Sequence, residues 1–146
     1  MMVIPIILTP EVAVQREAAW SSVKDTCVDL LGPKNEPLAV LNPTKECGTI
    51  IDSIISEYPE QVAASSQINA TKPCKIKKYL HAEFVYFPGD ILFKSFTIIV
   101  PLRVSGNVKF GEEIVDENHY YYVLNGTFLS VASGSRLEAI SISNIE

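Results

Sequence analysis

Two histidines, His81 and His119, are the side chains of this sequence best suited to bind a metal or to transfer a proton near neutral pH. A mononuclear zinc site needs three or four converging ligands, and no Cys-x-x-Cys or His-x-His pair supplies them locally. A metal-dependent enzyme would therefore have to bring both histidines together with a carboxylate such as Glu83 or Glu117. We keep that as a third hypothesis, and we predict no metal ligand, no catalytic residue and no cofactor.

Nucleophilic catalysis and phosphate binding have no local motif in the sequence. It contains no Gly-x-Ser-x-Gly turn and no Gly-x-x-x-x-Gly-Lys-Ser/Thr loop. Cys27, Cys47 and Cys74 are odd in number and widely spaced, so we expect them to be reduced and partly buried. Carboxylates surround a predicted turn, where we expect a solvated acidic rim: Glu112, Glu113, Asp116 and Glu117.

Length and charge limit the classes of protein to consider. A chain of 146 residues predicts a single domain, 1–146, with a helical part at 1–70 and a β-meander part at 71–146. A net charge of −5 argues against a nucleic acid as the main partner and against a membrane surface. The apolar start, Met1 to Leu8, lacks a cationic region and is interrupted by Pro5. We therefore expect no signal peptide, no transmembrane segment, and a location in the cytoplasm or in a virion.

The segment from Lys75 to Ser143 consists of β-forming runs separated by turn residues. Apolar residues recur at every second position from Leu80 to Phe87, and Pro88-Gly89-Asp90 breaks the run. A longer run, 91–104, is apolar on both faces over part of its length, and Pro101 within it predicts an edge position or a bulge. We predict a meander of about six antiparallel strands, at 80–87, 91–104, 108–115, 120–124, 127–131 and 137–143.

The strongest local signal in that half is Asn125-Gly126 between two β-forming runs. This dipeptide favours a type I′ hairpin, in which both central residues have positive φ. Such a hairpin would pair three sets of residues across its two strands: Leu124 with Thr127, Tyr122 with Leu129, and Tyr120 with Val131.

The first half of the sequence predicts two helices. Thr9-Pro10-Glu11 is a typical helix start, and Gly32-Pro33 is a typical stop. Asn42 or Thr44 can cap a second helix, which Pro59 ends or bends. Each helix shows apolar residues at three- and four-residue spacing, and short strands are possible at 2–8 and 38–41. The fold class we predict is α+β, with two N-terminal amphipathic helices packed on the antiparallel meander.

The segment from His119 to Gly126, which reads His-Tyr-Tyr-Tyr-Val-Leu-Asn-Gly, resembles part of the first motif of the cupin family. The resemblance covers about eight residues, and the motif's His-x-His pair and following glutamate are missing. A jelly roll of that family would place its second glycine-containing motif after this segment, whereas Pro88-Gly89-Asp90 precedes it. We carry over no metal site from the resemblance.

The strands carry more apolar surface than two short helices obviously cover. Tyrosine suits interfaces because it combines apolar area with a hydroxyl that tolerates water. An interface with a partner is one way to bury that surface, and a second layer built from 2–8 and 38–41 is the other. Five residues are our interface candidates: Tyr120, Tyr121, Tyr122, Phe93 and Ile99.

The leading functional expectation is a non-enzymatic structural or assembly protein that acts through protein–protein contacts. Its partners would be further copies of itself or the members of a larger assembly. By analogy of size and layout, a viral or phage virion component such as a connector, tail or decoration subunit is one form of it. The second hypothesis is a domain that binds a small ligand or carbohydrate near the tyrosines, Glu117 and Asn118.

Overall fold

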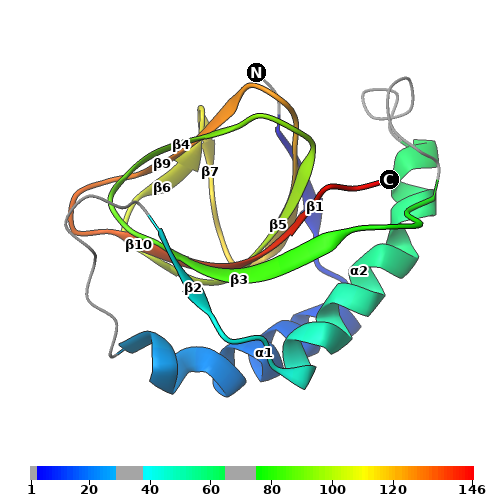
Figure 1. Ribbon diagram of the computed structural model, residues 1–146, viewed down its shortest axis with the longest axis horizontal. Coiled ribbons are helices and arrows are strands. Elements are labelled where there is room, and N and C mark those ends of the chain that lie inside the picture. Colours follow the sequence, from blue (N-terminus) through cyan, green and yellow to red (C-terminus); the bar gives the residue numbers. More distant parts are fainter. Residues whose placement is uncertain (1–2, 29–37, 65–74) are drawn as a thin grey trace.

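The computed structural model describes residues 3–28, 38–64 and 75–146 (Figure 1). Within these ranges the chain forms two helices and ten strands, in the following order: β1 (Val3–Ile7), α1 (Pro10–Val28), β2 (Leu38–Leu41), α2 (Lys45–Ala64), β3 (Leu80–Tyr86), β4 (Gly89–Phe93), β5 (Thr97–Ser105), β6 (Val108–Phe110), β7 (Glu113–Ile114), β8 (His119–Val123), β9 (Thr127–Val131) and β10 (Arg136–Ser143). In the described ranges, neither helix is long and apolar enough to cross a membrane.

The strands form two antiparallel sheets that face each other. The larger sheet has the order β1-β8-β5-β10-β3-β2, and the smaller has the order β4-β9-β6-β7. Consecutive strands from β3 to β10 change sheet at every connection except the one between β6 and β7. This is the arrangement of a jelly roll, with both described helices packed on the free side of the larger sheet (Figure 1).

The predicted fold class, two amphipathic helices on a single meander of about six strands, is therefore wrong. The chain is mostly β and has a six-stranded and a four-stranded sheet. Two strands from the predicted helical part, β1 and β2, form the edges of the larger sheet and do not make a second layer. The predicted turns are present, but a turn sequence specifies where the chain reverses and not which sheet the next strand joins.

The turn at Asn125-Gly126 connects the two sheets and does not close a hairpin within one sheet. The strands on either side of it, β8 and β9, belong to different sheets, so the predicted hairpin pairs do not form. Gly126 has a φ of 90°, whereas Asn125 is not among the residues with positive φ. The N–H of Thr127 donates to the carbonyl of Leu124 at 3.2 Å. Positive φ at the second central residue alone is the geometry of a type II turn.

Pro101 lies in β5, a central strand with β8 and β10 on its two sides. The predicted edge position is wrong and the predicted bulge is confirmed, because the register shifts at this point. Glu138 pairs with Arg103 while the next residue of β10, Ala139, pairs with Pro101, which leaves Leu102 as the extra residue. The predicted long strand at 91–104 is interrupted at 94–96, before the bulge, and is thereby divided into β4 and β5.

Both helices begin where the sequence predicts. The backbone N–H of Val12 donates to Thr9 Oγ1 at 3.3 Å, and the N–H of Cys47 donates to Thr44 Oγ1 at 3.2 Å, so each threonine is an N-cap. Pro59 lies within α2 and does not end it. The buried side of α1 carries Arg16 between its apolar residues, which is why α1 is not a clear amphipathic helix.

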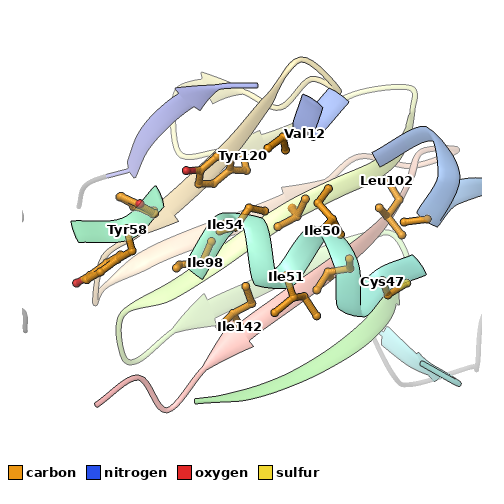
Figure 2. Packing of buried hydrophobic residues seen from close by; sticks show 14 of the residues in the cluster. Val12, Cys47, Ile50, Ile51, Ile54, Tyr58, Ile98, Leu102, Tyr120 and Ile142 are labelled. Atoms are coloured by element: carbon orange, nitrogen blue, oxygen red, sulfur yellow. The ribbon is translucent and has the colours of Figure 1, made fainter. Parts of the chain in front are cut away.

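The larger sheet separates two apolar cores. Between the sheets lie residues from both, among them Tyr86, Ile99, Phe110, Tyr121 and Leu129. On its other side the sheet packs against the helices, and Figure 2 shows Ile50, Ile51 and Ile54 of α2 beside Ile98 and Ile142 of the sheet. Burying one such side chain stabilises the fold by about 1.5–3 kcal/mol. The larger sheet is therefore covered on both faces.

Candidate functional site

The three consecutive tyrosines of β8 alternate between the two cores. Tyr120 and Tyr122 belong to the core under the helices and Tyr121 to the core between the sheets, and all three are buried. The hydroxyl of Tyr120 donates to Glu57 Oε1 at 2.9 Å, and burial raises the pKa of Tyr121 to about 12. These phenols are therefore neutral core residues, which a partner could contact only if the layers separated.

The other two interface candidates lie between the sheets. Ile99 is fully buried there. Phe93 is half-buried at the end of β4, and its ring centroid is 6.1 Å from that of Phe110. The structure thus uses four of the five candidates to fill the interior of one chain, and only Phe93 keeps some exposed area.

An apolar surface that the sequence reasoning missed lies on the smaller sheet. Residues of its strands that do not face the core between the sheets form what we call the outer face: Asp90, Leu92, Lys109, Ile114, Phe128 and Ser130. Leu92 and Phe128 are direct cross-strand partners and are 40% and 46% exposed. Ile114 on β7 is 64% exposed. Period-2 alternation in 127–131 was the available signal, because it places Phe128 and Ser130 opposite the core residues.

Charges of both signs flank the exposed apolar side chains of the outer face. Asp90 on β4 pairs with Ser130 on β9, and Ser130 pairs in turn with Lys109 on β6. The acid and the base therefore lie in one cross-strand row, separated by two interstrand steps or roughly 10 Å.

A second surface feature is a groove of about 360 Å³ between β1, α1 and the loop that precedes β8. We call it the Arg16 groove, and its lining residues are Ile7, Leu8, Ala13, Arg16, Glu117, Asn118 and His119. Two of these residues, Glu117 and Asn118, are the polar residues that the ligand-binding hypothesis names. The tyrosines of that hypothesis do not line it.

Arg16 connects α1 to the bulge in β5. Its Nη1 donates to the carbonyl of Leu102, the extra residue of the bulge, at 2.7 Å and approaches Glu117 Oε1 at 3.5 Å. Glu117 Oε2 accepts the N–H of Val104 at 2.8 Å. A second ion pair joins the guanidinium to the neighbouring carboxylate of Glu17. The buried guanidinium therefore hydrogen-bonds the carbonyl of the bulge residue and pairs with two carboxylates, so that its charge is compensated.

The predicted acidic rim divides into two pairs. Glu112 and Glu113 are exposed as expected. Asp116 and Glu117 are half-buried and hydrogen-bonded. Asp116 Oδ1 accepts the N–H of Asn118 and contacts His119 Nδ1, both at 2.8 Å. These last two carboxylates order the wall of the Arg16 groove.

The structure does not bring the two histidines together. His81 lies on β3 and His119 on β8, and two strands separate these in the larger sheet. Three interstrand steps of about 4.8 Å place the strands roughly 14 Å apart. Metal–nitrogen bonds are about 2 Å long, so this placement argues against one mononuclear site for both. Across residues 3–28, 38–64 and 75–146, no three or more His, Cys, Asp and Glu side chains are grouped to hold a metal ion.

Two buried carboxyl groups lie on the face of the larger sheet that packs against the helices. Glu83 on β3 and Glu138 on β10 are almost fully buried. Burial raises the pKa of both, and the nearby basic side chains, His81 and Arg136, only partly oppose this. Cys47 of α2 is a free, buried thiol whose pKa is raised mainly by burial. The side chain of Cys27 and all of Cys74 lie outside the described residues.

Comparison with known structures gives a likeness of fold. A crystal structure of a prolyl-4-hydroxylase from Pseudomonas putida is similar to this chain, with a TM-score of 0.55. The two share 14% sequence identity over 97% of this chain and 90% of the other. At this identity the likeness shows the fold and not the activity. No family model and no curated protein matches the sequence.

Proposed function

We propose that this chain is a non-enzymatic assembly protein that associates with a second copy of itself through the outer face of the smaller sheet. The observation that carries the proposal is the exposed pair of Leu92 and Phe128 on adjacent strands. Ile114 is also exposed and lies on β7 beside Lys109, two strands away from Phe128. Both described helices cover the larger sheet and leave this face bare (Figure 1). Contiguous exposed apolar residues surrounded by polar ones mark interaction surfaces.

The charges of the outer face favour a second copy as the occupant. A two-fold interface brings the same patch of both subunits together, so a self-complementary patch is required. Asp90 and Lys109 lie in one row on the outer face. In a two-fold pair the acid of each copy can therefore approach the base of the other, and this pairing fixes the orientation more than it adds affinity.

The size of the face indicates a weak, reversible dimer. Its strands have five, five, three and two residues. At about 3.4 Å per residue and about 4.8 Å between strands, the face measures roughly 240 Å² per copy. Stable interfaces bury about 800 Å² per partner, so this contact is well below that size and belongs to the class of weak, transient contacts. Association should consequently depend on protein concentration. The assignment to a virion connector, tail or decoration subunit stays a prediction from layout.

Light scattering over micromolar to millimolar concentrations tests the proposal with two matched variants. Phe128→Lys places a charge within the outer face. Val14→Lys places the same charge on α1, at a residue that is 70% exposed and lies away from that face. We expect a rising dimer fraction for wild type and for Val14→Lys, and a monomer for Phe128→Lys with an unchanged melting temperature. A strictly monomeric wild type, or a Phe128→Lys variant that still dimerises, would show the proposal to be wrong.

A further inference from the structure

We infer that the Arg16 groove binds a neutral, hydroxyl-rich small molecule the size of a monosaccharide. The groove lies between β1, α1 and the start of β8, whereas the outer face is built from the smaller sheet. The inference therefore goes beyond the proposed self-association and does not depend on it. It rests on the size of the groove, on the hydrogen-bonding groups of its rim and on its apolar wall.

The rim offers donors and acceptors within one small space. Glu117 contributes a carboxylate whose position is fixed by the N–H of Val104 and by Arg16. Asn118 is exposed, and its side-chain amide both donates and accepts. His119 contacts Asp116 through Nδ1, so in the tautomer that donates there, Nε2 is an acceptor. A hydroxyl group both donates and accepts, and it can therefore pair with each of these groups.

The charges of the groove favour a neutral ligand. The guanidinium of Arg16 is already paired with Glu17 and Glu117 and with the carbonyl of Leu102. Glu117 is likewise occupied by Arg16 and by the N–H of Val104. An anionic ligand would meet the carboxylate of Glu117, while a cationic ligand would compete with Arg16 for it. Hydroxyl groups bind such preordered charged side chains without bringing a charge that must be desolvated.

One wall of the groove is apolar. Ile7 is 71% exposed, and with Leu8 and Ala13 it forms a surface on which the C–H face of a sugar ring can pack. Small-molecule sites combine an apolar lining with a few placed polar groups in about 300–1,000 Å³. The volume of about 360 Å³ is at the lower end of that range and suits one ring rather than a chain of them.

The test is a titration of the ¹⁵N-labelled protein with glucose, galactose and mannose, monitored by amide chemical shifts. We expect saturable shifts at Ala13, Asn118 and His119 with at least one of the three sugars. Ala13→Leu fills the groove and should weaken binding by about tenfold or more, which corresponds to ~1.4 kcal/mol. Ala18→Leu makes the same change at an exposed position of α1 that does not line the groove, and it should leave the affinity unchanged. Asn118→Ala should weaken binding several-fold.

Each alternative result bears on the inference. It is wrong if none of the three sugars produces saturable shifts at these residues, or if Ala13→Leu and Ala18→Leu bind equally well. Inorganic phosphate and lysine amide are titrated in parallel. If either of these charged probes saturates the same residues more tightly than every sugar, the ligand is charged and the inference is overturned. The melting temperature of each variant is measured first, so that a loss of fold is not mistaken for a loss of binding.

Discussion

The two sheets of this jelly roll differ in what covers them, and their strands differ accordingly. In the larger sheet, six successive residues from Thr97 to Leu102 are buried, as are four from Tyr120 to Val123. In the smaller sheet, Thr127, Leu129 and Val131 are buried, while the residues between them are partly or largely exposed. A continuous apolar run therefore marks a strand covered on both faces, and alternation marks a strand with one face in water.

The comparison also changes where a partner should be sought. The strands richest in aromatic and aliphatic residues contribute little exposed apolar surface, because the helices and the second sheet already cover them. The alternating strands of the smaller sheet contribute the cross-strand pair of Leu92 and Phe128. An apolar side chain is available to a partner when its face is uncovered, however few such residues the strand has.

The largest expected effect comes from shortening one side chain in each sheet. Ile98→Ala removes buried atoms between the larger sheet and the helices and should lower the free energy of unfolding by about 2–5 kcal/mol. Leu92→Ala on the outer face should lower it by only about 0.5 kcal/mol. Urea denaturation of both variants measures the difference. Equal losses would mean that the two sheets are not covered as differently as described.

Replacing Arg16 tests what holds α1 against the larger sheet. Arg16→Met keeps much of the packing volume but leaves the carbonyl of Leu102 and the carboxylate of Glu117 without their guanidinium partner. A buried polar group that loses its partner costs about 1–3 kcal/mol. Thermal and urea denaturation measure the loss, with Lys24→Met on the exposed side of α1 as the control. An Arg16→Met variant as stable as the control would show that the bulge needs no such anchor.

The smallest expected effect is a pH dependence from the carboxyl group of Glu83. Burial raises its pKa in the folded chain above the ordinary value of 4.5, so the folded chain holds this proton more tightly than the unfolded chain does. Its stabilising contribution is therefore complete below pH 4.5 and is lost as the pH rises through the raised pKa. Glu83→Gln should lose stability less than wild type does between acidic and neutral pH. The control Glu112→Gln, at an exposed position, should follow wild type, and a Glu83→Gln curve parallel to it would contradict the assignment.

Local features of the fold were predictable from the sequence. Thr9 and Thr44 cap the helices as predicted, and the bulge at Pro101 is present because proline cannot donate to the strand ladder. Each of these depends on residues close together in the chain. The apolar excess of the β segment was also visible in the sequence. The sequence did not show that the smaller sheet covers one face of the larger, because the turn between β8 and β9 is predicted as a hairpin within one sheet and instead connects the two sheets.

The candidate site was less predictable, for the same reason. Phe128 is exposed because neither of the two described helices lies over the outer face of the smaller sheet, and that depends on which strands join which sheet. Arg16 is buried because the bulge in β5, 86 residues away, presents a carbonyl to it. Glu83 occupies a position that the alternating pattern assigns to the less buried face, and it is buried because α2 covers that face. Pairings between distant strands determine all three environments.

The most direct test of the outer face as the site of self-association is a concentration series of methyl spectra with a soluble nitroxide. The nitroxide broadens the signals of methyl groups that solvent can reach. We predict that Leu92 and Ile114 become protected as the concentration rises from micromolar to millimolar, while the exposed methyls of Ile7 and Val14 stay equally broadened throughout. Protection of Ile7 or Val14 instead, or no change at Leu92 and Ile114 over the series, would contradict the account.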